Sequence, residues 1–513
     1  MTTLRETFSG LAEVDSPGLL TASGSWSWRE YVEQAELRAR AIAGMLDPAR
    51  PPHVGVLLDN TAEMAFQLAA AGIGGHVVVG LNTTRRGTGM ASDITRSDCQ
   101  FVVTDAAHRP LLEATDVPIL DETQVWQTPN TAGPPRTVGP ATLFMLIFTS
   151  GTSGEPKAVR MTHEKVTFPG IMLADRFQLT AEDVCYVSMP LFHSNAIMAG
   201  WSVAIAAGAA IALGERFSAS GFIEDARSYG ATYANYVGKP LAHILATPPK
   251  PDDDDNPLRV VFGNEAGERD ITEFGRRFGC LVWDGFGSTE NAVIVTRTPD
   301  TPTGSIGQPL DGVAVLDPET SRECPRAVVD EHGNVSNLDD AVGELVNTLG
   351  AGQFAGYYND EAATSARMRD GMYWSGDLAW RDQAGYVYFA GRTSDWLRVD
   401  GENLAAAPIE RILLRHPLVS EAAVYAVPDP SSGDQLVAAL VLREDVTLSP
   451  AEFESFLAGQ EDLGTKAWPR HVLLAVSLPR TATNKVLKRA LQQQGLDQMT
   501  WIREERGRAY SAR

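Results

Sequence analysis

The stretch Thr149-Ser150-Gly151-Thr152-Ser153-Gly154-Glu155-Pro156-Lys157 directly follows an apolar run from Leu143 to Phe148. We expect the run to form a buried strand that leads into a phosphate-binding loop. Glycines let several backbone N–H groups converge on one anion, hydroxyl groups add donors, and a lysine adds positive charge. An ordinary P-loop has glycine directly before the lysine and Ser or Thr directly after it. Here Gly154 lies three residues before Lys157 and Ala158 follows it. The loop therefore predicts nucleotide binding of a different kind.

The composition indicates a multidomain globular protein that does not bind nucleic acid. The chain has 513 residues, of which 44% are hydrophobic, so at least two domains with large cores are expected. Its formal net charge of −22 would repel a nucleic-acid backbone and an anionic membrane surface. Small molecules are the expected partners.

The cysteines and the N-terminus favour a cytoplasmic protein. The four cysteines are widely separated and form no C-x-x-C pair, so neither a zinc site nor a disulfide framework is indicated. Met1–Gly10 lacks the apolar core of a signal peptide. The uncharged segment Ala196–Leu213 is long enough to be weighed as a membrane span. Because it consists mostly of Ala and Gly, we expect Gly208 to divide it into a buried helix and a short strand.

An alternation of strands and helices predicts an α/β fold for the first part of the chain. His53–Leu58 has the pattern of a strand, Thr61–Gly72 that of a helix capped by Asn60, and Val77–Gly80 that of the next strand. The alternation continues through a helix at Gly87–Ser97 and strands at Phe101–Val103, Ala231–Tyr236 and Arg259–Phe262. Pro248–Pro257 has the composition of a solvated loop.

The rest of the chain predicts a small β-subdomain and then a compact α+β domain. Gly304–Asp311 and Gly343–Gly356 are glycine-rich with short β-prone pieces. Helices are expected at Ala406–Arg415 and Pro450–Ala458. Strands are expected at Glu421–Val427, Gln435–Leu442 and His471–Val476. The fold prediction is a large α/β N-terminal domain with a small β-subdomain, joined by a hinge to a small α+β C-terminal domain.

Five further motifs follow the loop in order along the chain. They are Gly263-Asn264-Glu265-Ala266; Asp284-Gly285-Phe286-Gly287-Ser288-Thr289-Glu290; Tyr373-Trp374-Ser375-Gly376-Asp377; Gly391-Arg392-Thr393-Ser394-Asp395 with Gly401-Glu402-Asn403; and Pro479-Arg480-Thr481-Ala482-Thr483-Asn484-Lys485. Each motif alone is a weak signal, whereas six in fixed order are specific. Together they resemble the adenylate-forming superfamily of acyl-CoA synthetases, peptide-synthetase adenylation domains and luciferases, over nearly the whole chain.

The resemblance implies ATP, Mg²⁺ and CoA as cofactors and co-substrates. Thr149–Lys157 would close over the β- and γ-phosphates. Asn264 and Glu265 would lie at the adenine, and Phe286 stands where relatives usually carry Tyr, so it can stack without a phenol hydrogen bond. Asp377 would bind the ribose hydroxyls, Thr289 the α-phosphate, and Glu290 the Mg²⁺ ion. The predicted nucleotide-binding set is Thr149, Ser150, Gly151, Thr152, Ser153, Gly154, Lys157, Asn264, Glu265, Asp284, Gly285, Phe286, Gly287, Ser288, Thr289, Asp377, Arg392 and Lys485.

The family also implies a mobile C-terminal domain. The expected division is an N-terminal domain at 1–391, a hinge at 392–396 and a C-terminal domain at 397–513. The expected catalytic set consists of Thr289, Arg392 and Lys485. Arg392 would contact ribose and phosphate, and Lys485 would bridge the substrate carboxylate and the α-phosphate. The position matches put the hinge at Ser394, where relatives often carry Asp or Lys, so the pivot itself stays open. Gly401 would line the pantetheine tunnel.

The segment Pro190-Leu191-Phe192-His193-Ser194-Asn195 matches the entry of the family's acyl pocket. Amino-acid-activating relatives carry Asp where this chain has His193, so an uncharged or apolar acid is favoured. The candidates for the pocket wall are His193, Met198, Trp201, Tyr236 and Gly238, although Met and Trp at helical spacing are core residues more often than ligand contacts. The residues of these motifs are most similar to those of the fatty-acid and very-long-chain branch of the acyl-CoA synthetases.

The resulting prediction is ATP-dependent activation of a lipid acid, followed by thioester formation with CoA. Three alternatives remain open at this point: an acyl-AMP ligase that loads a carrier protein, a ligase for steroid side-chain or aromatic acids, and a non-catalytic lipid-binding relative. The sequence is compatible with a homodimer and with peripheral contact with a membrane.

Overall fold

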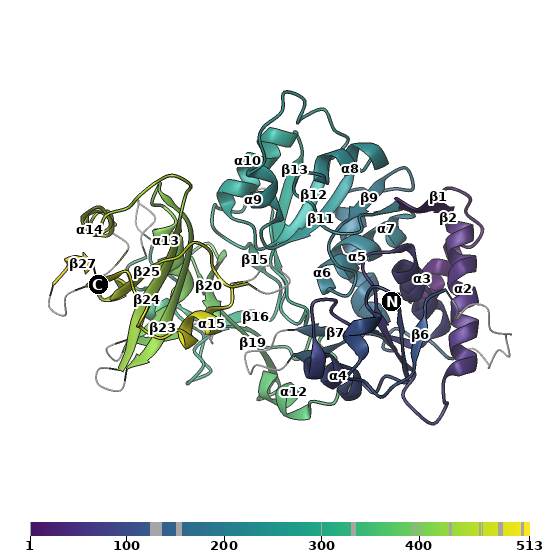
Figure 1. The fold of residues 1–513 in the computed structure, drawn as a ribbon. Helices are drawn as coiled ribbons and strands as arrows, with labels where there is room; N and C mark the ends of the chain where they lie inside the picture. The colour runs from purple at the N-terminus through teal and green to yellow at the C-terminus, as the bar shows by residue number, and fades with distance from the viewer. Residues whose placement is uncertain are drawn as a thin grey trace. The chain divides into compact units, whose positions relative to one another are not determined.

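The computed structural model divides into two compact units. Unit 1 comprises Met1–Ala292 and Gln353–Ala366, and unit 2 comprises Val293–Gly352 and Arg367–Arg513. Figure 1 gives the ribbon with the element labels used below. The structure describes residues 2–123, 136–149, 156–298, 300–329, 335–392, 396–399, 402–429, 433–460, 463, 465–480, 486–503 and 507–512.

Unit 1 contains a six-stranded sheet in the order β6-β5-β3-β4-β7-β8. All neighbouring pairs are parallel except β7 and β8, which run antiparallel. The central strands are apolar and buried, as expected for a sheet covered on both faces. The strands are β3 (His53–Leu57), β4 (Val77–Gly80), β5 (Phe101–Thr104), β6 (Ile119–Asp121), β7 (Leu143–Thr149) and β8 (Lys157–Thr162). The βαβ alternation predicted for this region is confirmed.

A second sheet of unit 1 has seven strands in the order β13-β12-β11-β9-β10-β1-β2. Its pairs are parallel except the β1–β2 hairpin. The strands are β1 (Pro17–Thr21), β2 (Gly24–Ser27), β9 (Val184–Val187), β10 (Ala210–Leu213), β11 (Tyr233–Val237), β12 (Val260–Asn264) and β13 (Leu281–Gly285). Ligands of open parallel sheets bind at the carboxyl ends of the strands, which directs attention to the residues after β11, β12 and β13.

Helices connect and cover these sheets (Figure 1). They are α1 (Leu4–Leu11), α2 (Trp28–Met45), α3 (Ala62–Gly74), α4 (Gly87–Arg96), η1 (Arg109–Leu112), α5 (His163–Arg176), α6 (Ser194–Ala196), η3 (Ile197–Trp201), α7 (Ser202–Ala207), α8 (Phe222–Tyr229), α9 (Pro240–Leu245), α10 (Glu268–Phe278) and α12 (Glu361–Arg367).

The apolar segment Ala196–Leu213 is divided as the sequence predicts. Its first part is helical and comprises the end of α6, the π-helical turn η3 and α7. The helical part ends at Gly208, which has φ of 67°, and β10 follows. Glycine suits this position because side chains disfavour the left-handed conformation. Within the described residues, we find no helix that is long and apolar enough to cross a membrane.

Two details of unit 1 differ from expectation. Helix α3 is capped by Thr61, whose side chain accepts a hydrogen bond from Met64 N, and not by Asn60. The buried Asn60 side chain instead bonds to the backbone of Met189, Leu191 and Gly214 and so links the two sheets. The loop at 248–257 is also not solvated throughout, because Asp253 is buried and pairs with Arg277 at 2.6 Å. Tertiary contacts decide both cases.

Unit 2 contains the expected β-subdomain, and its strands pair antiparallel. Its main sheet runs β16-β17-β19-β18, with β20 paired to β19, and β14 pairs with β15. The elements are β14 (Val295–Thr296), β15 (Gln308–Pro309), β16 (Val313–Leu316), α11 (Leu338–Ala341), β17 (Gly343–Asn347), β18 (Met368–Arg369), β19 (Met372–Arg381) and β20 (Val387–Arg392).

The remainder of unit 2 is the expected α+β arrangement. A hairpin of β21 and β22 precedes a five-stranded sheet in the order β23-β24-β25-β26-β27. The core of this sheet includes Phe453, Trp468 and Trp501. The elements are β21 (Trp396–Val399), β22 (Glu402–Ala405), α13 (Ala406–Leu413), β23 (Val419–Asp429), β24 (Gly433–Leu442), α14 (Pro450–Ala458), η5 (Thr465–Ala467), β25 (His471–Leu474), α15 (Lys488–Gln493), β26 (Trp501–Arg503) and β27 (Tyr510–Ala512).

Candidate active site

The carboxyl ends of β11, β12 and β13 bring together two of the predicted site residues, Tyr236 and Asp284. Parallel pairing puts Tyr236 opposite Gly263 and Gly263 opposite Asp284. The Tyr236 hydroxyl donates to Asp284 Oδ2 at 2.7 Å, and the same oxygen accepts from Ala266 N at 3.0 Å. The side chain of Asp284 therefore fixes the start of the loop that follows β12, where the adenine contacts are predicted.

That loop holds a non-glycine residue in the left-handed conformation. Glu265 has φ of 71°, which is uncommon for a residue with a side chain and is typical of functional loops. The preceding Gly263 has no room for a side chain, because a Cβ there would collide with the backbone oxygen and ring of Tyr236. Next to it, Asn264 Nδ2 donates to Gly285 O at 2.7 Å. The motif residues thus shape a tightly packed turn with Glu265 exposed at its tip.

Asn195 connects the predicted acyl-pocket entry to the adenine side. Its Nδ2 donates to Tyr236 O at 2.9 Å and approaches Asn264 Oδ1 at 3.3 Å. Its Oδ1 accepts from Asn235 Nδ2 at 2.7 Å. Asn195 and Asn235 are buried, so these hydrogen bonds form away from competing water.

The neighbouring Ser194 makes a second connection between the same regions. Its hydroxyl lies 2.8 Å from that of Thr289, the predicted α-phosphate contact. Both side chains are buried. Adjacent residues of α6 therefore contact both nucleotide-binding segments.

Glu290, the predicted Mg²⁺ ligand, has an aromatic partner. The Tyr357 hydroxyl donates to Glu290 Oε1 at 2.8 Å, and Lys157 Nζ lies 5.2 Å from the centre of the Tyr357 ring. Lys165 is buried on α5, where burial lowers its pKa to about 7, while the Glu290 carboxylate opposes this shift. The chemistry around Glu290 suits anionic phosphates and a hard cation.

Strand pairing joins the two ends of the predicted phosphate-binding loop Thr149–Lys157. Thr149 is paired with Lys157 across β7 and β8, and Thr149 Oγ1 lies 3.5 Å from Lys157 O. Ser150, Gly151, Thr152, Ser153 and Gly154 lie outside the described residues, as do Ser394, Gly401 and Lys485.

Asp377 and Arg392 form a separate pair within unit 2. Asp377 Oδ1 lies 3.2 Å from Arg392 Nε, and the two residues are opposite each other on β19 and β20. Asp377 is 5% exposed, whereas Arg392 is exposed. The backbone N–H of Asp377 donates to Ser375 Oγ at 3.0 Å. The predicted ribose ligand and its neighbour in the sheet are thus brought together.

The acyl-pocket candidates are only partly grouped. His193 caps α6, where its side chain accepts from Asn195 N, and Gly238 N donates to Asn264 O at 2.9 Å. Met198 is half-buried on η3. Trp201 lies in the aromatic core, stacked on Phe144 at 5.9 Å with its Nε1 donating to Tyr31. Its packing favours the structural interpretation of Trp201.

Three residues of the site had no role in the sequence prediction. Ser194 and Asn195 belong to the quoted pocket-entry motif, but nothing in that motif indicates their partners. Tyr357 lies outside the six motifs.

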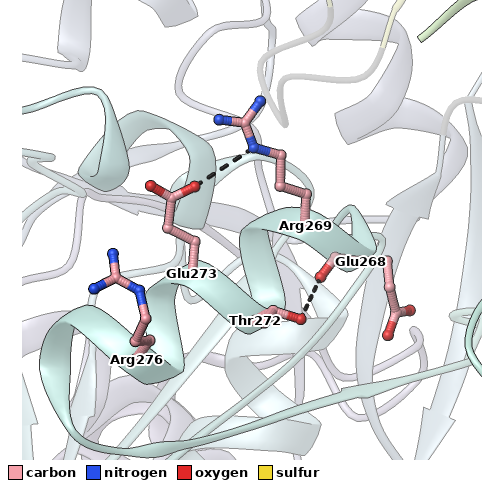
Figure 2. A pocket seen from close by; sticks show the side chains of 5 residues that line it. All are labelled: Glu268, Arg269, Thr272, Glu273 and Arg276. Carbon is pink, nitrogen blue, oxygen red and sulfur yellow. Dashed lines mark hydrogen bonds and ion pairs between the residues drawn. The ribbon is translucent and has the colours of Figure 1, made fainter. Parts of the chain in front are cut away.

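A hollow along α10 is not part of this site. Figure 2 shows the side chains that line it, with Arg269 Nε 3.5 Å from Glu273 Oε2 and Thr272 Oγ1 donating to Glu268 O. The fifth side chain lining it is that of Arg276. None of these residues carries the chemistry of the predicted motifs, so the hollow is a feature of the helix surface.

Comparison with known families matches both parts of the chain. The AMP-binding enzyme family matches residues 12–358, and the AMP-binding enzyme C-terminal domain matches residues 408–485. Curated relatives are similar over almost the full length. The medium/long-chain-fatty-acid–CoA ligase FadD17 of Mycobacterium marinum is 52% identical over 95% of both chains. The steroid-22-oyl-CoA synthetase of Rhodococcus jostii is 46% identical over 94% of this chain and 89% of its own.

Solved structures share the fold. ATP-bound MatB from Rhodopseudomonas palustris superposes with a TM-score of 0.82 at 23% identity, covering 97% of this chain and 99% of its own. The o-succinylbenzoate CoA synthetase MenE from Bacillus subtilis, in complex with its acyl-adenylate, gives 0.80 at 25% identity, covering 96% and 99%. The predicted fold class and resemblance are thereby confirmed: the chain belongs to the AMP-binding enzyme family and is an acyl-CoA synthetase.

Proposed function

We propose that the enzyme activates a medium- or long-chain lipid acid with ATP and transfers the acyl group from the adenylate to CoA. The observation that carries this proposal is 52% identity, over 95% of both chains, to a relative named for that substrate class. The pocket-entry segment supports it, because His193 stands where amino-acid-activating relatives carry an acid. A cationic substrate has no matching charge at that position.

The nucleotide would be held by residues of the predicted motifs. The turn at Asn264 and Glu265 would receive the adenine against Phe286, and Thr289 would donate to the α-phosphate. Asp377 would accept the ribose hydroxyls, and Arg392 would contact ribose and phosphate. The loop Thr149–Lys157 binds and then releases pyrophosphate. These groups act mainly by positioning and by neutralising charge, since two anions must meet for the carboxylate to attack phosphorus.

The residues around Glu290 fit a Mg²⁺ ion. Among the described residues, no group of three or more His, Cys, Asp or Glu side chains could hold a metal. A single carboxylate suits Mg²⁺, which commonly binds one or two carboxylates together with substrate phosphates and water. Tyr357 orients that carboxylate through the 2.8 Å hydrogen bond to Oε1. The ion would supply charge neutralisation at the phosphates.

The second half-reaction would use the mobile C-terminal domain. We assign the domains to 1–391 and 397–513, with a hinge at 392–396 around Ser394. Lys485 would bridge the substrate carboxylate and the α-phosphate during adenylation, and Gly401 would line the pantetheine tunnel afterwards. The separate family matches to 12–358 and 408–485 support a two-domain division.

A steroid side-chain acid is the second candidate substrate. It is favoured by the 46% identity to the steroid-22-oyl-CoA synthetase. An ATP–pyrophosphate exchange assay with a panel of fatty, aromatic and steroid acids would distinguish the two candidates. Exchange that is strongest with C8 to C18 fatty acids supports the proposal, whereas exchange restricted to steroid acids selects the alternative. Mass spectrometry after addition of CoA tests the acceptor, since a carrier-protein ligase would leave CoA unmodified.

A further inference from the structure

Strand β19 carries a bulge that includes Asp377. Its pairing with β17 joins Glu344 to Leu378 but Val346 to Trp374, so two steps along β17 correspond to four steps along β19. The extra length lies at Ser375, Gly376 and Asp377. Bulges of this kind redirect side chains and are frequent beside active sites. The direction of the Asp377 carboxylate therefore depends on the conformation of this bulge.

The bulge has a glycine at its centre. Gly376 has φ of 75°, and a Cβ there would collide with the guanidinium of Arg367. Its N–H donates to Glu344 Oε1 at 2.6 Å, a hydrogen bond to a side chain of the facing strand. The Glu344 side chain thus accepts the hydrogen bond that the Gly376 N–H would otherwise donate to a backbone carbonyl of the neighbouring strand.

Glu344 is placed for this task at an energetic cost. It is 4% exposed, and burial raises its pKa, whereas the Gly376 N–H and the nearby Arg369 and Arg367 favour its ionised form. Arg369 Nη2 lies 3.2 Å from Glu344 Oε2. A buried carboxylate is expensive unless it is paired and hydrogen-bonded, and here one oxygen bonds to the bulge while the other pairs with the arginine.

We infer that Glu344 is a positioning residue for nucleotide recognition: by holding the Gly376 N–H it fixes the bulge that aims Asp377 at the ribose hydroxyls of ATP. This inference rests on the ribose role proposed for Asp377. It assigns to Glu344 a function separate from general stability, because losing the bond to Gly376 changes the direction of one carboxylate.

The ribose itself provides a selective measurement. The readout is the ratio of kcat/KM for ATP to kcat/KM for 2′,3′-dideoxy-ATP, measured by pyrophosphate exchange. A loss of general stability lowers both values together, whereas misdirection of Asp377 lowers only the value for ATP. Asp377→Ala serves as the reference, and its ratio should fall close to one.

Three substitutions, two at Glu344 and one at Gly376, then test the role of Glu344. Glu344→Asp withdraws the carboxylate by one methylene and should lower the ratio about tenfold. Glu344→Gln retains an oxygen acceptor at the same reach and should restore most of the ratio. Gly376→Ala disturbs the bulge while leaving Glu344 in place, and should lower the ratio as Glu344→Asp does. Circular dichroism and thermal unfolding confirm that the compared variants are folded.

The outcomes separate this inference from the proposed function. An unchanged ratio in Asp377→Ala overturns the ribose assignment itself and, with it, the inference. A collapsed ratio in Asp377→Ala together with a wild-type ratio in Glu344→Asp overturns only the role of Glu344.

Discussion

The hydroxyl groups of Ser194 and Thr289 lie 2.8 Å apart, and both side chains are buried in unit 1. This pair joins the segment that should admit the acid to the segment that should bind the α-phosphate. If Thr289 donates its proton to a phosphate oxygen, its own oxygen accepts from Ser194, and the two hydroxyls form a polarised chain.

Replacing Ser194 should therefore slow adenylation. Ser194→Ala removes one neutral hydrogen bond, worth about 1 kcal/mol, so the rate of pyrophosphate exchange should fall about fivefold with little change in the KM for the acid. Ser202→Ala is the matched control, because Ser202 is equally buried and donates to Met198 O. Equal rates for wild type and Ser194→Ala would contradict a role of the Ser194–Thr289 hydrogen bond in adenylation.

Tyr357 should influence the metal requirement. Tyr357→Phe keeps the ring near Lys157 but removes the hydrogen bond to Glu290. Loss of a partner that orients a metal ligand commonly weakens metal binding about tenfold, so half-maximal activity should need more Mg²⁺. The control is Tyr358→Phe, because the Tyr358 hydroxyl bonds to Asp98 instead. If the two variants share one Mg²⁺ dependence, Tyr357 does not orient a ligand of the ion.

Lys485 should separate the two half-reactions. Lys485→Ala should abolish pyrophosphate exchange yet leave thioester formation from a supplied acyl-adenylate. Lys250→Ala, at an exposed lysine paired with Glu224, is the control for removal of a positive charge. Equal loss of both half-reactions would show that Lys485 does not act in adenylation alone.

The stability of unit 1 should decrease in mild acid because of His163. Burial lowers the pKa of His163 from 6.5 to about 4, with a smaller effect from Arg5. The unfolded chain then binds a proton that the folded chain does not. The free energy of unfolding should accordingly be constant above pH 6.5 and fall between pH 6.5 and 4, by up to about 3 kcal/mol.

The variant His163→Asn tests this pH dependence. Asparagine can still accept the hydrogen bond that His163 Nδ1 receives from Leu4 N at 3.3 Å, and it does not titrate. Urea unfolding at pH 5 and pH 7.5 should show a smaller difference for the variant than for wild type. His76, whose pKa burial lowers to about 3, should account for part of the remaining difference. An identical difference in both proteins would exclude His163 as its source.

Much of the fold followed from local sequence patterns. The division of Ala196–Leu213 at Gly208 was predictable because a glycine at a helix end is a local signal. The cap of α3 was not, because Asn60 and Thr61 are both good caps and only the bonds of Asn60 to the second sheet leave Thr61 for the helix.

The site residues were predicted from the sequence motifs. The contacts that the prediction missed join residues that are far apart in the sequence. Asp284 was predicted from its motif, but its bond to Tyr236 follows from the register of β11, β12 and β13. Glu344 is 32 residues from Gly376 along the chain, and only the bulge in β19 reveals their contact. Trp201 has the spacing of a pocket residue, yet its ring lies against Phe144 in the core.

We propose that this enzyme joins a lipid acid to CoA through an adenylate. The most direct test is to incubate the purified protein with ATP, Mg²⁺, CoA and a series of fatty acids and to identify the products by mass spectrometry. We predict an acyl-CoA together with AMP and pyrophosphate, and an acyl-adenylate when CoA is omitted. Formation of ADP, or turnover of ATP with no acyl-adenylate for any fatty or steroid acid, would contradict the claim.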